Sequence, residues 1–307
     1  MTMLMALALA VSEVTIPGPK GPLAGTLVSA GVSAGEAAPV VVVIPGSGPT
    51  DRDGNSPLGI TPASYRLLAE ALAAKGVSTL RIDKRGMFGS KAGGDPNAVT
   101  IGAYADDARG WAAEAATRTG RRCAWLLGHS EGGLVAMAAA QRPAGICGVV
   151  LVAAPGRPLA QVMRAQLRAT PANAPILAPA LAAIDSLEAG RTVDPAGLPP
   201  PLPSLFPSAV QGFMIDLFAQ KPDRLVAALR VPVLIVQGDR DLQVSVEDAR
   251  TLAAAAPKAT LTLVPGVNHV LKSVEADPAS NMASYRDPSI PVAPAVVDAI
   301  AGFVKGG

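Results

Sequence analysis

The sequence predicts an α/β fold with a mostly parallel central sheet, helices on both of its faces and a helical insertion in its second half. Short apolar runs alternate along the chain with alanine-rich helical stretches, and this rhythm stops between residues 157 and 224. Such alternation of strands and helices is typical of a parallel sheet covered on both faces. The 307 residues therefore indicate one large domain with an insertion.

The first elements are a hairpin, a buried strand and a helix. Residues 13–16 and 23–30 resemble strands and are separated by a turn rich in Pro and Gly, which predicts an antiparallel hairpin. The run Val40–Ile44 is continuous and β-branched, as expected for a strand covered on both faces. Thr61 is a residue type that caps helices and Pro62 suits the first helical turn, so we expect a helix that begins there and ends at Gly76.

The remaining core elements continue the alternation. The expected strands are 77–82, 123–127, 148–152, 231–236 and Thr260–Val264, and the expected helices are 104–117, 134–140, Val246–Ala255 and 295–304. Residues 158–225 differ, because nine prolines fall between residues 171 and 207. An unstructured loop of this length is improbable in a compact domain, so we expect a helical cap over the carboxyl edge of the sheet. The predicted organisation is an α/β core at 1–157 and 226–307 with a helical cap insertion at 158–225.

Composition excludes several classes of protein. Half of the residues are hydrophobic and 16% are charged, which is too apolar for a disordered chain. The chain has a net charge of +2 and only 3% aromatic residues. It therefore lacks the basic surface and the stacking side chains that are typical of a nucleic-acid-binding protein. No apolar stretch reaches about 18 residues, so we expect no membrane span. The oligomeric state stays open.

The amino terminus and the two cysteines bear on cellular location. Residues 1–11 are apolar and contain Ala-Leu-Ala at 8–10, which resembles a signal-peptide cleavage site, but no Lys or Arg precedes it. We expect a cytoplasmic location, with export and cleavage near Ala10 as the alternative. Cys123 and Cys147 each begin an expected strand and could be neighbours in the sheet. Two cysteines make no disulfide framework, however, and we expect free buried thiols.

A candidate nucleophile lies in the middle of the chain. Residues 128–132 read Gly-His-Ser-Glu-Gly and match the nucleophile elbow, Gly-x-Ser-x-Gly. The elbow needs a strand before the serine and a helix after it, because the tight turn then projects the hydroxyl above the sheet. Ser130 has both expected elements. Ser33 lies in a second match at 31–35, but another strand follows it, so we interpret Ser33 as a loop serine.

A serine nucleophile needs a base and a carboxylate that orients the base. Of the two histidines in the chain, His129 belongs to the elbow and is poorly placed to accept the proton of Ser130. His269, in the loop after the last core strand, is therefore the candidate base. Asp239 and Asp241 both follow an expected strand, and we favour Asp241, at the apex of its loop, over Asp239. The chain order of nucleophile, acid and base is that of one serine-hydrolase architecture.

Other charged residues near these motifs are interpreted as structural. Ser245 and Asp248 have the spacing of a capping box at the start of a helix. The adjacent charges of Asp51, Arg52 and Asp53 predict a salt-bridged brace of their loop.

The negative charge that develops on a substrate carbonyl needs two backbone N–H donors, which form an oxyanion hole. We expect one donor from Glu131, directly after the nucleophile. We expect the other from Ser47 in the loop Pro-Gly-Ser-Gly-Pro at 45–49, whose glycines allow close backbone approach. Phosphate binding by this loop is the alternative, but the loop lacks the Gly-Lys-Ser/Thr ending of a nucleotide-binding loop.

With these motifs the chain resembles the α/β-hydrolase superfamily over nearly its whole length. Gly-His-Ser-Glu-Gly at 128–132, Gly-Ser-Gly-Pro at 46–49 and Asp-Lys-Arg-Gly at 83–86 are similar to a bacterial esterase and serine-peptidase-like branch. The resemblance implies the α/β-hydrolase fold and a helical cap that shapes the substrate pocket. It also implies a catalytic triad of Ser130, Asp241 and His269.

These observations favour a serine esterase that cleaves carboxylic esters of short to medium acyl chain through an acyl-Ser130 intermediate. Phe206, Phe213 and Phe218 make the insertion apolar, and we expect them to line the pocket of a small-molecule ester. A peptidase or amidase, or a thioesterase, on the same triad is the alternative. A non-catalytic binding protein of the same fold is a further alternative. We expect no cofactor and no metal site, because one available histidine and two separated cysteines have no ligand spacing.

Overall fold

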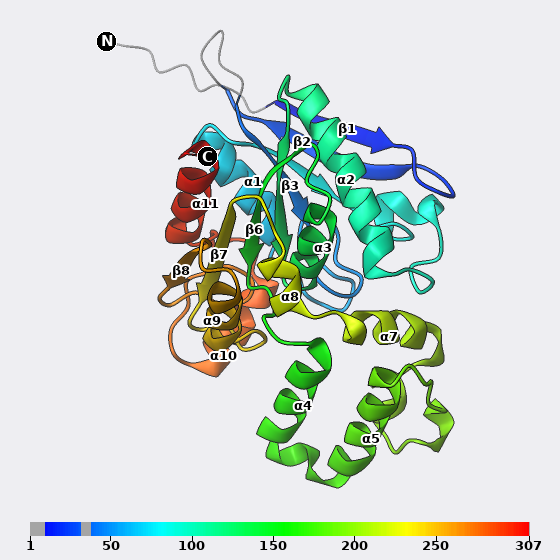
Figure 1. Cartoon of the computed structure of the whole chain (residues 1–307). Coiled ribbons are helices and arrows are strands. Elements are labelled where there is room, and N and C mark those ends of the chain that lie inside the picture. The colour runs from blue at the N-terminus through cyan, green and yellow to red at the C-terminus, as the bar shows by residue number, and fades with distance from the viewer. Residues whose placement is uncertain (1–9, 32–37, 307) are drawn as a thin grey trace.

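The computed structural model describes residues 10–31 and 38–306, and its centre is an eight-stranded sheet (Figure 1). The strand order is β1-β2-β4-β3-β5-β6-β7-β8. The β1–β2 and β2–β4 pairs are antiparallel and the other pairs are parallel, which confirms the leading hairpin and the mostly parallel sheet. The strands are β1 (Ala10–Ile16), β2 (Leu23–Ser29), β3 (Val40–Ile44), β4 (Ser78–Ile82), β5 (Ala124–His129), β6 (Ile146–Val152), β7 (Val233–Gly238) and β8 (Thr260–Val264).

Two sequence features lie partly or wholly outside the described residues. Ser33, interpreted above as a loop serine, is not among them. Of the candidate cleavage site, only Ala10 is described, and it is the first residue of β1.

The central strands separate two apolar cores, one on each face of the sheet. Along β3, Val40, Val42 and Ile44 belong to one core and Val41 and Val43 belong to the other, because successive side chains of a strand point to opposite faces. All five side chains are buried. Burial on both faces explains why this strand has no polar residue.

Helices cover both faces. The helices α2 (Ile101–Arg118), α3 (Glu131–Ala140) and α9 (Val246–Ala255) contribute to the first core, and α1 (Ser64–Ala74) and α11 (Pro294–Gly306) contribute to the second. Shorter elements lie in the connections: η1 (Phe88–Gly93), α10 (Pro278–Ala283) and η5 (Ser284–Arg286). The start expected for α1 is wrong by a few residues. Ala63 precedes the helix in the left-handed conformation, with a φ of 53°, and the Thr61 N–H instead binds the Tyr285 carbonyl.

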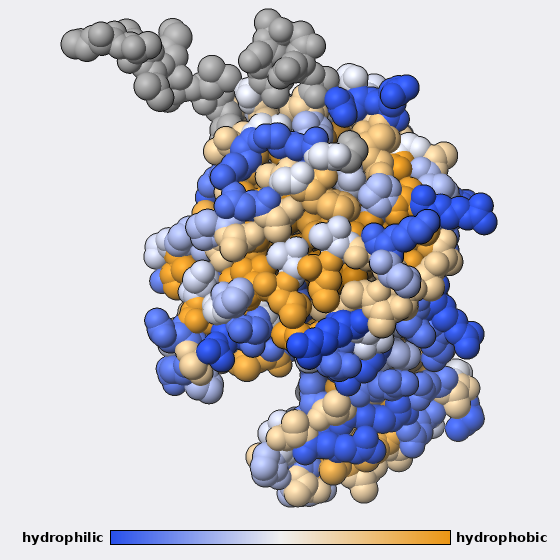
Figure 2. Space-filling view, turned by 60° about the vertical axis from the view of Figure 1, so that its left-hand side comes forward, coloured by the Kyte–Doolittle hydropathy of each residue, from blue (hydrophilic) through white to orange (hydrophobic). Residues whose placement is uncertain are grey.

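Helices also fill the chain between β6 and β7. Most of this chain is the insertion expected at residues 158–225, here called the 158–225 segment. These helices are α4 (Leu159–Ala169), η2 (Pro171–Ile176), α5 (Leu177–Glu188), η3 (Pro195–Gly197), α6 (Leu202–Leu205), η4 (Ser208–Val210), α7 (Gln211–Ala219) and α8 (Pro222–Ala227). The segment projects from the core as a lobe that is largely hydrophilic on the face seen in Figure 2. Its interior is a small apolar cluster of its own. That this lobe covers an active site stays a prediction.

One stretch of the described residues, Leu202–Ala219, is long and apolar enough to cross a membrane by length and composition alone. It is not one continuous helix, because Pro207 separates α6 from η4 and α7. Phe206 and Phe218, near its two ends, are fully buried inside the protein. We therefore interpret this stretch as part of the core of the 158–225 segment.

The expectation of free thiols is wrong, because Cys123 and Cys147 form a disulfide. Cys147 lies in β6 and Cys123 directly precedes β5. These strands are parallel neighbours in which Ala124 pairs with Ile146, and the two cysteine Cα atoms are 5.3 Å apart, within the range that a disulfide spans. The bond joins the two strands at their amino ends.

The predicted salt-bridged brace is confirmed for Arg52 and Asp53, whereas Asp51 accepts the backbone N–H groups of Asp53 and Asn55, at 2.9 and 2.8 Å. Arg52 forms salt bridges with Asp83 at 3.0 Å and with Glu13 at 2.6 Å, and Arg81 pairs with Asp53. These contacts hold the loop after β3 against β1, β2 and β4.

Asp248 ties the start of α9 to the chain that leaves β6. The expected capping box between Ser245 and Asp248 is present. The same carboxylate accepts two hydrogen bonds from the Arg157 guanidinium, at 2.9 and 2.8 Å, and its side chain is fully buried. Burial raises the pKa of Asp248, but the hydrogen bonds from Arg157 and Ser245 outweigh it, so the pKa lies below its usual value.

We predict that Asp248→Ala lowers the free energy of unfolding by about 3 kcal/mol, because the helix loses its cap and Arg157 loses its partner. Urea denaturation measures this change. Glu247→Ala, an exposed neighbour in the same helical turn, is the matched control and should change it by less than about 1 kcal/mol.

The effect of Asp248 should depend on pH. Because folding lowers its pKa, its contribution to stability is present above the pKa of the unfolded chain, about 3.9, and is lost as the pH falls through the folded value. The stability difference between wild type and Asp248→Ala should be constant from pH 5 to 8 and shrink below about pH 4. An undiminished difference at pH 2 to 3 would contradict this assignment.

Candidate active site

Ser130 occupies a sharp turn between β5 and α3. Its φ of 54° and ψ of −123° are strained for a residue with a Cβ, and a nucleophile elbow uses such a turn to expose the hydroxyl. Two glycines make the turn possible. A Cβ on Gly128 would collide with the backbone of Gly132, and a Cβ on Gly132 would collide with the Ile44 carbonyl. The helix begins at Glu131, earlier than the sequence predicts.

His269 and Asp241 form a hydrogen-bonded pair at the same cavity. His269 Nδ1 lies 2.8 Å from Asp241 Oδ2. The other carboxylate oxygen accepts the backbone N–H groups of Gln243 and Val244, at 2.7 and 2.9 Å. Burial raises the pKa of Asp241, but His269 and these hydrogen bonds outweigh it and hold the pKa below its usual value. The carboxylate therefore stays ionised beside the imidazole.

Asp239, the alternative carboxylate, makes a different contact. Its side chain accepts the backbone N–H of Gly266 at 2.7 Å, and the residue is exposed. Asp239 thus braces the turn that leads toward His269, whereas Asp241 contacts the imidazole itself.

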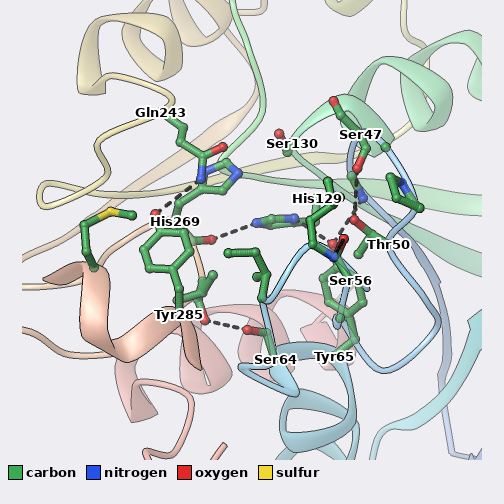
Figure 3. A pocket seen from close by; sticks show the side chains of 18 residues that line it. Ser47, Thr50, Ser56, Ser64, Tyr65, His129, Ser130, Gln243, His269 and Tyr285 are labelled. Atoms are coloured by element: carbon green, nitrogen blue, oxygen red, sulfur yellow. Dashed lines mark hydrogen bonds between the residues drawn. The ribbon is translucent and has the colours of Figure 1, made fainter. Parts of the chain in front are cut away.

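His129 links the loop of His269 to the loop after β3. Its Nε2 lies 2.8 Å from the His269 carbonyl oxygen, and its Nδ1 lies 2.8 Å from the Tyr65 hydroxyl (Figure 3). Burial lowers the pKa of His129 to about 3, so the ring is neutral near pH 7. Because a carbonyl only accepts, the ring proton is on Nε2 and Tyr65 donates to Nδ1. The Tyr65 oxygen can then accept the N–H of Gly46, at 3.1 Å.

Sequence reasoning missed this connection. The sequence indicated only that His129 is poorly placed to be the base. In the structure its side chain bridges the His269 carbonyl and the Tyr65 hydroxyl. No sequence signal indicated Tyr65, which comes from α1. Burial raises its pKa further, so the phenol keeps the proton that it donates to His129.

The loop of His269 is held by buried amides that sequence reasoning also missed. The Asn268 side chain donates to Asn281 Oδ1 at 2.9 Å and contacts Ser284 Oγ at 2.7 Å. Its own oxygen accepts the backbone N–H of Lys272 at 3.1 Å. These bonds connect the loop to α10 and η5 and so restrict the position of the imidazole.

The two residues expected to provide oxyanion donors lie next to Ser130 in space. Glu131 follows it directly and begins α3. The loop after β3 passes against Ser130, since a Cβ on Gly46 would be 3.2 Å from the Ser130 Cβ. Figure 3 shows Ser130 between His269 and Ser47. The donor role of the two backbone N–H groups stays a prediction.

A cavity of about 360 Å³ opens at Ser130 and His269. Residues of the loop from Gly46 to Ile60 line it together with Met282 and Tyr285. Leu58 and Met282 are apolar and well exposed. Among the described residues, no Lys, Arg, Asp or Glu lines the cavity. It therefore suits an uncharged ligand group. Across residues 10–31 and 38–306, no three His, Cys, Asp or Glu side chains are grouped as a metal site requires.

Phe206, Phe213 and Phe218, which the sequence analysis expects to line the substrate pocket, do not line this cavity. Phe206 and Phe218 are fully buried in the core of the 158–225 segment. Phe213 packs edge to face on Tyr104 of α2, with ring centroids 6.1 Å apart. A lobe that projects from the core needs large apolar side chains to fill its own interior, and composition does not distinguish that use from pocket lining.

Comparison with known sequences gives a family and a relative. A model of the Alpha/beta hydrolase family matches residues 41–280. Esterase EstD of Thermotoga maritima is 29% identical over 238 residues, which are 77% of this chain and 51% of the relative. The chain thus spans about half the length of this curated relative.

Solved structures share the fold at low identity. Est1E from Butyrivibrio proteoclasticus, with ferulic acid bound, is 18% identical with a TM-score of 0.59, covering 95% of this chain and 99% of its own. The Pyrococcus furiosus esterase Pf2001 is 18% identical with a TM-score of 0.59, covering 97% and 93%. The esterase domain of a Rhodothermus marinus protein is 17% identical with a TM-score of 0.57, covering 97% and 98%. Together with the family match over most of its length, this common fold means that the chain belongs to the alpha/beta hydrolase family.

Proposed function

We propose that this protein is a serine hydrolase that cleaves carboxylic esters through an acyl-Ser130 intermediate. The observation that carries the proposal is the His269–Asp241 pair, which shares one cavity with a serine held in the elbow conformation. The name of the curated relative, an esterase, supports the same reaction. The substrate partner is a small-molecule ester.

In this mechanism the Ser130 oxygen forms a bond to the ester carbonyl carbon while His269 Nε2 takes the hydroxyl proton. Asp241 stabilises the resulting imidazolium through Nδ1–H. The carbonyl oxygen becomes an oxyanion that accepts the backbone N–H groups of Ser47 and Glu131. When the carbonyl re-forms, the bond to the alcohol breaks, and the alcohol leaves with the proton from His269. Water then attacks the acyl carbon while the same imidazole takes its proton. The bond between that carbon and the Ser130 oxygen breaks, the imidazolium returns the proton to Ser130, and the carboxylic acid leaves.

The cavity favours an ester over a peptide. A peptidase that trims free amino termini needs a carboxylate to bind the ammonium group, and the described lining has no acidic side chain. Leu58, Ile60, Val270 and Met282 instead offer an apolar surface to an alkyl or acyl group. An amidase or a thioesterase on the same three residues is the second candidate. A non-catalytic binding protein is disfavoured because the His269–Asp241 contact is intact.

Cellular location stays a prediction. The sequence favoured the cytoplasm over export, but the disulfide between Cys123 and Cys147 argues for export, because disulfides are rare in cytosolic proteins.

We predict that Ser130→Ala lowers kcat for p-nitrophenyl esters by roughly 10⁴- to 10⁶-fold, because the acyl-enzyme no longer forms. Circular dichroism should show an unchanged fold. Ser33→Ala, in the second Gly-x-Ser-x-Gly match, is the control and should retain wild-type turnover. Near-normal turnover by purified Ser130→Ala would contradict the proposed mechanism. A parallel assay with aminoacyl p-nitroanilides separates esterase from amidase activity.

The two candidate carboxylates can be ranked by amide substitution. Asp241→Asn should lower kcat by about 10⁴-fold, because an amide in place of the carboxylate favours the wrong imidazole tautomer. Asp239→Asn should change kcat by less than about threefold, since Asp239 is exposed and contacts only a turn. Steady-state kinetics on one p-nitrophenyl ester measures both. A larger loss for Asp239→Asn would mean that the acid is assigned wrongly.

The cavity walls should set substrate chain length. Leu58→Ala and Met282→Ala should move the optimum of kcat/KM toward longer chains, with each buried methylene worth about 0.8 kcal/mol, or roughly fourfold. Two series measure this: p-nitrophenyl esters from acetyl to dodecanoyl, and acetate esters of graded alcohols. Phe206→Ala and Phe218→Ala should destabilise the protein by about 3–5 kcal/mol without moving either profile. Unchanged profiles in both wall variants, or a moved profile in a folded Phe variant, would reverse this assignment.

A further inference from the structure

Lys84 is a buried lysine that points at the loop after β3. It follows β4 in the Asp-Lys-Arg-Gly motif at 83–86, and only 3% of its side chain is exposed. Its ammonium group donates a hydrogen bond to the Gly46 carbonyl oxygen at 2.6 Å. That carbonyl belongs to the same peptide unit as the N–H of Ser47, which the proposed mechanism assigns to the oxyanion hole.

We propose that Lys84 is a positioning residue that orients and polarises the Gly46–Ser47 peptide so that its N–H binds the oxyanion. This inference rests on the proposed esterase function. The peptide unit is planar and trans, so its C=O and N–H point in opposite directions. A cation that holds the oxygen therefore aims the N–H away from Lys84. A charge-assisted bond on the carbonyl also strengthens the hydrogen bond that the N–H donates.

A second contact of Lys84 reaches the other donor. Glu131 Oε1 lies 3.6 Å from the Lys84 ammonium, and the Glu131 side chain is only 4% exposed. Glu131 provides the second backbone N–H of the proposed hole. One lysine thus connects the loop after β3 to the first residue of α3. Burial lowers the pKa of Lys84, and the Glu131 carboxylate opposes this change.

Gly46 is held from its other side as well. Its N–H donates to the Tyr65 hydroxyl at 3.1 Å, so side chains bind both polar groups of this glycine. A glycine has a wider range of backbone angles than other residues, so the loss of these bonds would make the direction of the Ser47 N–H less fixed. Stability alone is a weak explanation for the buried pair of Lys84 and Glu131, since apolar replacements of buried ion pairs often stabilise proteins.

The double variant removes both members of the buried pair, so that no carboxylate is left without its cation. The Glu131→Gln variant, in which Lys84 loses its carboxylate but keeps the Gly46 carbonyl as a partner, is the reference. Glu131→Gln is made first, and Lys84→Met is then added to it, so that the ratio of the two variants isolates the lysine. We expect the addition to lower kcat by roughly 10- to 100-fold, less than the loss of a whole oxyanion donor, with KM changed by less than about threefold. A trifluoromethyl ketone, which forms an oxyanion adduct with the active serine, should lose affinity by the same factor as kcat.

A matched control addresses a purely structural role. Arg85 and Asp107 form a neighbouring ion pair at 2.6 Å that is also mostly buried, so Arg85→Met with Asp107→Asn makes a comparable neutral replacement. This control should keep the wild-type kcat. Circular dichroism and thermal unfolding establish that each variant is folded at the assay temperature. If Lys84→Met with Glu131→Gln does not fold, Lys84→Gln with Glu131→Gln replaces it under the same criteria.

Three results would overturn the role of Lys84: an unchanged kcat, an unchanged ketone affinity, or an equal loss in the Arg85 control. Ser130→Ala is assayed beside these variants. If Ser130→Ala keeps turnover, the proposed function fails. If Ser130→Ala is inactive and the lysine variant is unaffected, the proposed function stands and only the inference about Lys84 fails.

Discussion

The turn at Ser130 is the constraint on which the rest of the site depends. A serine holds a φ of 54° only where the surrounding structure opposes relaxation. That opposition comes from α3, nearly all of whose residues are buried, and from its close approach to β3 and β5. Gly128 and Gly132 permit this approach, because a Cβ on either would meet backbone atoms. Looser packing of α3 would let the turn relax and would withdraw the hydroxyl from the cavity.

Around this turn, buried polar side chains connect loops that come from different strands. Lys84 and Tyr65 bind the two polar groups of Gly46, and His129 connects Tyr65 to the carbonyl of His269. Hydrogen bonds of this kind are stronger in an apolar interior than in water, and an unpaired member would be costly. The loop that approaches Ser130 and the loop that carries the His269 imidazole are therefore held relative to each other as well as to the sheet.

The 158–225 segment and the cavity at Ser130 are packed separately. The segment has its own apolar cluster, and it is attached to the core by contacts such as Phe213 on Tyr104 and the Asp216 carboxylate on the Ile101 N–H. The described walls of the cavity come from the core and its connections. A substitution in the cavity walls and one in the core of the lobe therefore act on separately packed parts of the protein.

The sequence by itself determined the parallel sheet, the elbow at Ser130 and the preference for Asp241, because periodicity, a five-residue motif and position after a strand are local properties. The tertiary structure alone decided the disulfide, the burial of Phe206 and Phe218 and the bridge through His129. These features depend on contacts between distant residues, such as the bond between residues 129 and 269, which are 140 positions apart. Residue type limits which contacts a side chain makes, but only the folded chain brings its partner within reach.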